Sequence, residues 1–573
     1  MKLFKNIFLL VLVWGISSCE MTEFDLQQDP NNVSPENASL NDLYNSVQLQ
    51  FANVYSSAQT APGAMARMYH LGSSIYLAST SPGTFNGLWN NAYANLFPDI
   101  DALLDIAEPG GFDVHAGAAK IMKAYTLMTL VDLLGDVPNS EALQGTDVIS
   151  PMADEGSVVY EAAIALLDEA IAQLEGTSAA PPRTDLFYGG NVDNWIKVAK
   201  TLKLRAAVTT RLVNPNESAS TINALVSEGD LISDASEDFA FQFGTERNNP
   251  NSRHPFYNSH YEIGDGDYMS NYYMWLMLDD KEDANDNDVI DPRVRFYFTR
   301  KVEDAANQDQ TTYGCFLSNL PDQSAIPAHW VAVDPDLNYC YATSNGYIGR
   351  DHLNPEGIPP DGPIRTSYGL YPGGGEFDYD QFEDTRQRGT TGGLGGGIWP
   401  IMMSSFVDFM RAEAALTLGT NDDPRALLES GVRKSIDKVL GFRNLVPSTM
   451  ALQIDIRGTI VSVEDFFVPD QDDIDAYVQV VLDAYDSAAN DDERLNVIIK
   501  EYYIAAWGNG LEAYNMYRRT GHPANMQPGL EAEVGAYPRS FFRPEVYVNR
   551  NQNAQQKELT DRVFWDDGST DLY

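Results

Sequence analysis

The stretch EGSVVYEAAIALLDEAIAQLE at residues 155–175, followed by NVDNWIKVAKTLKLRAAVTTRLV at residues 191–213, decides the fold class. In the first segment four apolar residues recur at helical spacing and share one face: Ala163, Leu167, Ala170 and Leu174. In the second segment the inward positions are Trp195, Val198, Ala199, Leu202 and Ala206. Lysines alternate with these positions and form a solvated face. Two amphipathic segments of comparable length predict a helical hairpin.

The same pattern continues on both sides of this hairpin. Helices are expected at residues 41–58, 86–107, 113–135, 402–419, 423–441, 471–487 and 491–507. Gly135 is expected to end the third of these, and Asp422-Asp423-Pro424 to open the fifth. Stacked helical hairpins of about 34 residues are typical of tetratricopeptide repeats. The full repeat consensus is absent, so the sequence predicts helical hairpins that are only loosely similar to that repeat.

Residues 231–400 differ from the helical segments in composition. Glycine, proline, aromatic residues, asparagine and aspartate dominate there, with turn signals such as Pro372-Gly373-Gly374-Gly375 and Gly392–Gly397. The many aromatic residues favour an ordered structure over a disordered linker. We therefore expect a mainly α protein in which scaffold residues 41–230 and 401–525 flank a loop-rich ligand-binding part at 231–400. An irregular tail follows at 526–573.

Composition excludes several classes of function. The chain has 573 residues, of which 43% are hydrophobic, which is enough for a large core. It carries 82 acidic against 38 basic residues, a formal net charge of −44. Such a charge repels phosphate backbones and argues against nucleic-acid binding. Solubility is the simpler interpretation of the acidity, and recruitment of a cationic partner is the alternative.

The first residues are typical of an export signal. Lys2 and Lys5 precede an apolar run that is too short to span a bilayer, and small residues follow it. The sequence Ile16-Ser17-Ser18-Cys19 is similar to a bacterial lipobox, in which the cysteine becomes the lipidated N-terminus. We expect a lipoprotein signal peptide at residues 1–18, lipidation of Cys19 and a polar tether at 19–40. An ordinary signal peptide with an incidental cysteine is the alternative.

The sequence lacks the common catalytic and metal-binding motifs. The chain contains no His-Glu-x-x-His, Cys-x-x-Cys or Gly-x-Ser-x-Gly sequence, and its seven histidines are scattered. Residues 283–288 are similar to a calcium loop but lack its glycine and its glutamate, so a solvated acidic loop is the simpler interpretation. Cys315 and Cys340 can form a disulfide or remain free thiols. We expect no catalytic residue and no cofactor.

Several segments resemble the SusD/RagB family, in its SusD-like branch. They are the lipobox at Cys19, Asp29-Pro30-Asn31-Asn32, the run Leu134–Ala142, the helix Trp195–Arg205, the run Glu512–Pro523 and the run Tyr537–Asn549. These elements occur in the family's order across nearly the whole chain. The resemblance implies a single SusD-like domain with four tetratricopeptide-like hairpins and a loop-rich binding half.

The resemblance also implies a function. Members of the family are lipid-anchored at the outer membrane, face the exterior and capture a glycan or, in some branches, a peptide. Their partner is a TonB-dependent SusC-like transporter barrel, and they are generally not enzymes. A surface-anchored glycan hydrolase on the same scaffold is the alternative function.

Candidate ligand-binding residues are aromatic, lie outside core periodicity and have polar neighbours, because sugar rings stack on flat aromatic faces. Tyr76 and Trp89 flank the polar loop Ser79–Gly87. Trp330 and Tyr341 lie in the loop-rich part near Asp334 and Arg350, which are able to hydrogen-bond hydroxyl groups. The alternative for Trp89 is the core of its helix, and for Trp330 and Tyr341 it is local packing within a long loop.

Overall fold

A computed structural model describes residues 39–264, 266–303, 326–337, 339, 345–355, 364–382, 389–448 and 451–573. The expected signal peptide, Cys19 and the tether up to residue 38 lie outside the described residues. So do Cys315, Cys340 and the candidate ligand residue Tyr341.

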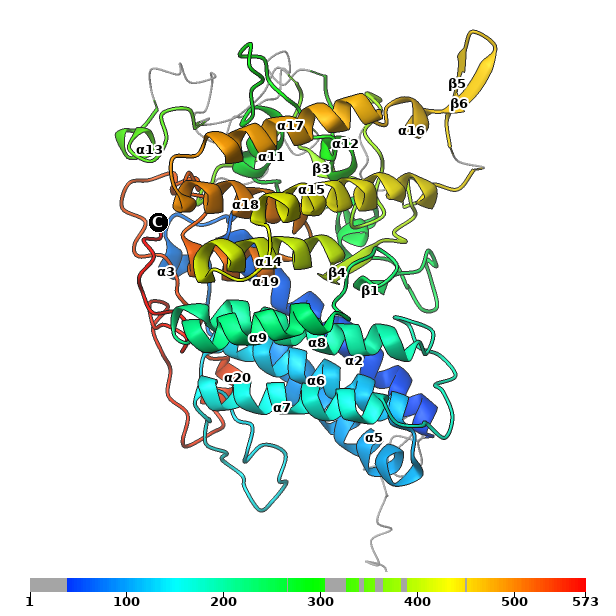
Figure 1. The fold of residues 1–573 in the computed structure, drawn as a ribbon, viewed down its shortest axis with the longest axis vertical. Helices are drawn as coiled ribbons and strands as arrows, with labels where there is room; N and C mark the ends of the chain where they lie inside the picture. The colour runs from blue at the N-terminus through cyan, green and yellow to red at the C-terminus, as the bar shows by residue number, and fades with distance from the viewer. Residues whose placement is uncertain are drawn as a thin grey trace, which may run out of the picture.

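Long helices dominate the structure, which confirms the predicted fold class (Figure 1). The lower part of the view contains α2 (Leu40–Met65), α5 (Phe97–Gly110), α6 (Asp113–Leu134), α7 (Gly156–Leu174), α8 (Val192–Thr209) and α9 (Pro215–Glu228). The upper part contains α14 (Ser404–Leu418), α15 (Pro424–Leu440), α17 (Gln471–Ser487) and α18 (Asp491–Ala505), with α19 (Gly510–Thr520) next to α2. Consecutive helices pack as pairs, including α6 with α7, α7 with α8 and α14 with α15.

The sequence explains these helices locally. All the inward positions predicted for residues 155–175 and 191–213 are buried. Asp423 caps α15 by accepting from the backbone N–H groups of Arg425 (3.0 Å) and Ala426 (3.3 Å). Gly135 ends α6 with φ 77°, a conformation that glycine adopts without strain. Helix α6 is buried on nearly every side, so it lies at the centre of the helical layers.

The helix expected at residues 86–107 is interrupted. It consists of α4 (Asn86–Asn90), a π-helical turn η2 (Asn91–Leu96) and α5. Pro98 lies in the first turn of α5 and has no N–H group, so the regular hydrogen-bond ladder cannot pass through this position. The change from π to α geometry coincides with this proline.

The loop-rich part holds short elements. They are β1 (Phe239–Gln242), α10 (Pro255–Tyr257), η4 (Asn258–Ile263), α11 (Asn271–Leu278), α12 (Val294–Tyr297), β2 (Phe298–Thr299), α13 (Ala328–Val331), β3 (Ser367–Tyr368) and β4 (Ile398–Met402). Strand β1 pairs antiparallel with β4, with Phe241 opposite Trp399, and β2 pairs with β3. These segments pack through aromatic residues that join the same continuous core as the helices.

The remaining elements are short and peripheral. They are α3 (Tyr76–Ser79), η3 (Thr210–Leu212), η7 (Gly441–Leu445), β5 (Gln453–Ile456), β6 (Thr459–Ser462), α16 (Val463–Phe466) and α20 (Glu545–Val548). The antiparallel hairpin β5–β6 projects from the body of the molecule (Figure 1). Among the described residues, no helix combines the length and the apolar character needed to cross a membrane.

A buried polar cluster ties the helical layers to the tail. The carboxylate of Asp132 in α6 accepts from Arg205 Nη2 (2.8 Å), Asn515 Nδ2 (2.9 Å), Trp565 Nε1 (3.0 Å) and the Tyr160 hydroxyl. A buried carboxylate needs this degree of compensation, because desolvation of an ion is costly. The tail after residue 525 is therefore anchored in the core through Trp565.

Candidate functional site

Three of the predicted ligand residues, Tyr76, Trp330 and Asp334, meet one segment of the chain, residues 525–534. The Tyr76 N–H donates to Val534 O (3.0 Å), Trp330 Nε1 donates to Gly529 O (3.0 Å) and Asn525 Nδ2 donates to Asp334 Oδ2 (2.9 Å). Arg350 lies two residues before His352, whose N–H donates to Gln527 Oε1 (2.8 Å). We call this region, where α3, α13 and residues 345–354 meet segment 525–534, the α3–α13 face.

The aromatic rings expected to stack on a sugar are not open on this face. Tyr76 is 1% exposed and Trp330 is fully buried. The Tyr76 hydroxyl accepts from Arg67 Nη2 (3.0 Å), and burial raises the pKa of Tyr76 to about 12. For Trp330 the structure thus shows the alternative stated above, local packing of the loop, because the segment around Gly529 covers the indole.

Arg350 is likewise inside the protein. Its guanidinium lies over the Tyr268 ring at 3.9 Å from the centroid, and its Nη2 donates to the Tyr268 hydroxyl (3.1 Å). Nearby, burial lowers the pKa of His70 to about 4, so this imidazole is neutral at physiological pH. Arg350 is buried and offers no exposed donor in this structure.

Trp89 belongs to a second aromatic cluster, on α4. The ring centroids of Tyr93 and Tyr547 lie 4.3 and 4.4 Å from that of Trp89. The indole is half-buried, and Asn86 Nδ2 donates to Glu545 Oε1 (2.9 Å) beside it. The structure therefore separates Trp89, which packs on α20, from the residues that meet at segment 525–534.

Two residues of the α3–α13 face were missed as candidates. Tyr339 is half-buried and packs edge-on against Trp330, with the ring centroids 5.1 Å apart. His329 Nε2 lies 3.1 Å from Gly529 O. Tyr339 is one of many aromatic residues in the loop-rich part. No sequence signal distinguishes Tyr339 from these, and the partner of His329, Gly529, is remote in the chain.

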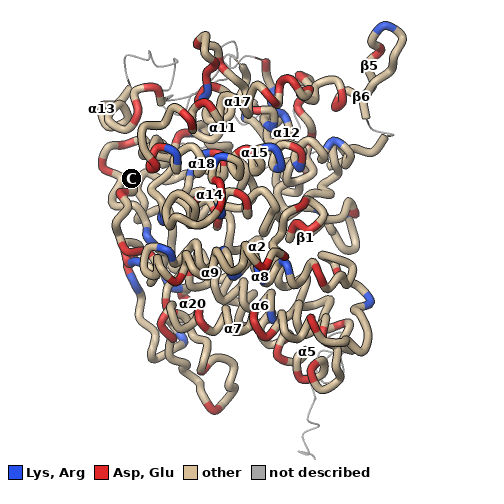
Figure 2. Tube along the Cα trace, in the orientation of Figure 1, with Lys and Arg blue, Asp and Glu red and all other residues tan. Residues whose placement is uncertain are grey.

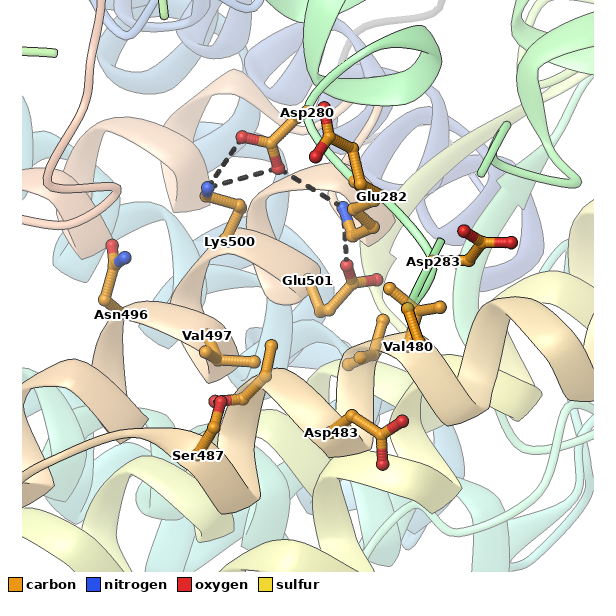
Figure 3. A pocket seen from close by; sticks show the side chains of 14 residues that line it. Asp280, Glu282, Asp283, Val480, Asp483, Ser487, Asn496, Val497, Lys500 and Glu501 are labelled. Carbon is orange, nitrogen blue, oxygen red and sulfur yellow. Dashed lines mark hydrogen bonds and ion pairs between the residues drawn. The ribbon is translucent and has the colours of Figure 1, made fainter. Parts of the chain in front are cut away.

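A separate cavity of about 420 Å³ lies between residues 280–284 and the helices α17 and α18 (Figure 3). We call it the α17–α18 pocket. Its floor is aliphatic and is formed by Val480, Val481, Ala484 and Val497. Charged side chains of both signs line the rest of it.

The charged groups behind this pocket form an ordered network. Lys500 Nζ lies 2.8 Å from Asp280 Oδ1, and Lys281 Nζ lies 3.1 Å from Glu501 Oε1 (Figure 3). Glu501 in turn lies 3.2 Å from Arg293 Nη2, which pairs with Asp291 at 2.6 Å. Burial would raise the pKa of Asp280, but the ammonium groups of Lys500 and Lys281 outweigh it and lower that pKa.

The acidic loop at residues 283–288 does not have the geometry of a metal site. Asp283 Oδ1 accepts from the N–H groups of Asn285 (2.8 Å) and Asn287 (3.0 Å), so its oxygen is engaged within its own loop. In the part of the chain that the structure describes, no group of three or more histidine, cysteine or acidic side chains is placed to hold a metal ion.

Comparison with known families agrees with this architecture. A family model described as starch-binding and associating with the outer membrane matches residues 30–329. A second model, described as SusD and RagB outer membrane lipoprotein, matches residues 397–572. No curated protein sequence matches the chain.

Solved structures share the fold at low sequence identity. A chitin-binding protein is 18% identical with a TM-score of 0.61, over 92% of this chain and 100% of its own. A SusD/RagB family protein from Bacteroides thetaiotaomicron is 18% identical with a TM-score of 0.61, over 93% and 100% of the two chains. A chitin-binding SusD homologue from Flavobacterium johnsoniae is 17% identical with a TM-score of 0.59, over 92% and 99%. The resemblance found in the sequence is confirmed, and the chain belongs to the SusD/RagB family.

Proposed function

We propose that this protein captures a glycan at the cell surface and delivers it to a TonB-dependent SusC-like transporter in the outer membrane. The observation that carries the proposal is the match of two outer-membrane family models to both parts of the chain. Two of the solved structures with this fold are named as chitin-binding, which makes chitin oligosaccharides the first ligands to test. Lipidation of Cys19 would hold the protein at the outer membrane, facing the exterior.

The α3–α13 face is the proposed ligand surface. It joins segments that are far apart in the chain, and Asp334 and His329 lie on it partly exposed. Tyr339 contributes a partly exposed ring to the same face. Carboxylate and imidazole groups are able to hydrogen-bond sugar hydroxyls, while one aromatic contact adds about 0.5–1.5 kcal/mol. Tyr76, Trp330 and Arg350 are proposed to support this surface from beneath.

Calorimetry on the purified protein tests the proposal. Chitin and starch oligosaccharides are titrated in turn, and each mixture is then analysed by chromatography. We expect heat of binding for at least one glycan and recovery of that glycan uncut. Shortened products would support the alternative, a surface-anchored hydrolase. Absence of binding to every glycan, with a folded protein, would overturn glycan capture.

Two further measurements test the anchor and the partner. Intact-mass analysis of the mature protein should show a diacylglyceryl group on Cys19, and Cys19→Ala should abolish membrane association. Purification in detergent should recover a barrel protein together with the tagged chain. Repeated recovery of the chain alone, with the lipid present, would contradict the transporter partnership and leave glycan capture standing.

A further inference from the structure

The buried charges behind the α17–α18 pocket neutralise one another. Three carboxylates, those of Asp280, Asp291 and Glu501, are matched by Lys281, Arg293 and Lys500 through ion pairs of 2.6–3.6 Å. Tyr477 donates its hydroxyl to Asp291 Oδ2 (2.7 Å) and completes the network. The network therefore contributes no net charge to the pocket, and any field at its mouth comes from other groups.

The rim of the pocket carries uncompensated negative charge. Glu282, Asp283 and Asp483 lie on different sides of it (Figure 3). Within the described ranges, no basic side chain forms an ion pair with any of the three. Hydrogen bonds from Asn287 and Asn285 lower the pKa of Asp283 to about 2, so this group stays ionised at physiological pH.

Among the described residues, no unpaired cation lines the pocket. Acidic residues are spread over the whole trace and basic residues are fewer, as Figure 2 shows. Two basic residues, Lys281 and Lys500, line the pocket, and both are paired inside the neutral network. A cation that enters the pocket would thus meet three carboxylates that have no ion-pair partner among the described residues. Asp283 and Asp483 accept hydrogen bonds from neutral amide groups, those of Asn285, Asn287 and Gln479.

The floor determines what kind of cation fits. Val480, Val481, Ala484 and Val497 present methyl groups, and no aromatic residue of the described part of the chain lines the pocket. A sugar would find no stacking platform there. An aliphatic stem would bury its methylene groups on this floor, and its charged end would remain at the mouth, as lysine side chains do at apolar surfaces.

We propose that the α17–α18 pocket receives a lysine side chain of a partner protein. The methylene stem lies on the valine floor, and the ammonium group lies among Glu282, Asp283 and Asp483. Lysine fits better than arginine, because its three donors form a compact point charge that matches three carboxylates from two segments, residues 282–283 and α17. The acidic residues at the rim of this pocket would then serve to recognise the partner's lysine.

Methyl NMR of the purified chain, labelled at valine, tests the pocket directly. The probe is the peptide Ac-Ala-Lys-Ala-NH₂, and the matched peptide carries norleucine in place of lysine. We expect the lysine peptide to shift the methyl signals of Val480, Val481 and Val497, and the norleucine peptide to bind at least about fivefold more weakly, since it lacks the charge. Equal binding of the two peptides would overturn the proposal.

Variants distinguish the pocket from the general negative field of the protein. The double variant Glu282→Gln/Asp483→Asn should weaken binding of the lysine peptide about fivefold or more. The control Asp472→Asn removes one exposed charge from α17 outside the pocket and should leave the affinity unchanged. An equal loss in the control would show attraction by net charge alone and overturn the proposal.

Glucosamine tests the other source of an ammonium group. It carries the charge on a pyranose ring, and we expect no shift of the three valine signals. Binding of glucosamine in the absence of peptide binding would assign the pocket to amino sugars and overturn the lysine assignment. Valine signals outside the pocket report whether each variant is folded.

Discussion

Dense aromatic packing distinguishes the loop-rich part from the helical scaffold, although both contain buried ion pairs. In the scaffold, buried ion pairs join helices that are distant in sequence, such as Arg205 of α8 with Asp132 of α6 and with Glu512 of α19. The loop-rich part also contains buried ion pairs, such as Arg293 with Asp291, and in addition aromatic rings and buried histidines fill the space between its short elements. Regular helices satisfy their own backbone, so their side chains are free to form ion pairs between helices, whereas irregular loops need dense packing to stay ordered.

A second ion cluster shows the same principle in the upper helices. Glu413 of α14 lies 2.7 Å from Arg519 Nε and 2.9 Å from Arg211 Nε. Burial would raise the pKa of Glu413, but Arg519 and Arg211 outweigh burial and lower it. This cluster therefore stays charged well below neutral pH.

The surroundings of His254, in the loop-rich part, differ from the charged Glu413 cluster. The imidazole packs against Trp399, with centroids 4.1 Å apart, and Phe256 stacks on Tyr368 at 4.2 Å. Burial lowers the pKa of His254 to about 3. The imidazole is neutral when folded, and protonation would place a charge among aromatic rings. We therefore predict that, as the pH falls, the loop-rich part unfolds before the scaffold.

Acidification should have the largest effect on stability. Burial lowers the pKa of His70 to about 4, and of His254 and His260 to about 3, against 6.5 for an unperturbed histidine. Between pH 6.5 and the lowered pKa values, the unfolded state binds more protons than the folded state. The free energy of unfolding therefore falls as the pH falls from 6.5 towards 4 and 3. When the pH is lowered from 7 to 5, the three histidines together should reduce the free energy of unfolding by about 6 kcal/mol, at 1.36 kcal/mol per pKa unit.

Denaturant titration at the two pH values measures this loss. Hydrogen exchange at pH 5 should show the segments around His254 and His260 opening before α6 and α8 do. Equal stability at pH 7 and pH 5 would contradict the assignment of these histidines as buried and neutral.

Removal of Asp132 should have the next largest effect. Asp132→Ala removes the buried acceptor of Arg205 Nη2, Asn515 Nδ2 and Trp565 Nε1, and breaking a buried pair costs about 3–5 kcal/mol. The control Asp168→Ala removes the same side chain from a solvent-facing pair with Lys203 and should cost less than about 1 kcal/mol. Similar losses for the two variants, in denaturant titration, would refute the central role of the Asp132 cluster.

Trp330→Ala tests the packing of the loop-rich part. The indole is fully buried and its Nε1 donates to Gly529 O (3.0 Å), so truncation should lower the unfolding free energy by about 3–4 kcal/mol. Calorimetric melting provides the measurement. A stable variant that has lost glycan affinity would show instead that Trp330 contacts the ligand, as the sequence suggested.

Tyr339→Ala should have the smallest effect, and it should appear in binding. Loss of one partly exposed aromatic contact should weaken glycan affinity by about 0.5–1.5 kcal/mol, while the melting temperature changes little. Trp89→Ala, on the separate α4 cluster, is the control and should leave affinity unchanged. The reverse result would move the ligand surface to α4 and α20.

The sequence predicted the helical part well because its information is local. Periodicity identified the buried faces of α7 and α8 residue by residue, and Asp423 was identified as a cap. The ligand surface could not be predicted in the same way from local periodicity. Whether Trp330 is exposed depends on Gly529, which is 199 positions away, and local pattern carries no signal for such a contact.

The α17–α18 pocket illustrates the same limit. Residues 283–288 stood out in the sequence only as an acidic loop. Their neighbours in the pocket come from α17 and α18, about 200 residues later in the chain, and the neutral network behind them joins four segments. Charge compensation of this kind emerges only when the segments meet in three dimensions.

Hydrogen–deuterium exchange with and without a bound glycan tests the central contrast most directly. The account predicts slower exchange on binding in α3, α13 and residues 525–534, with no change in α5 to α9. Protection confined to the helices α5 to α9, at saturating ligand, would contradict the division of the molecule into a scaffold and a ligand-binding part.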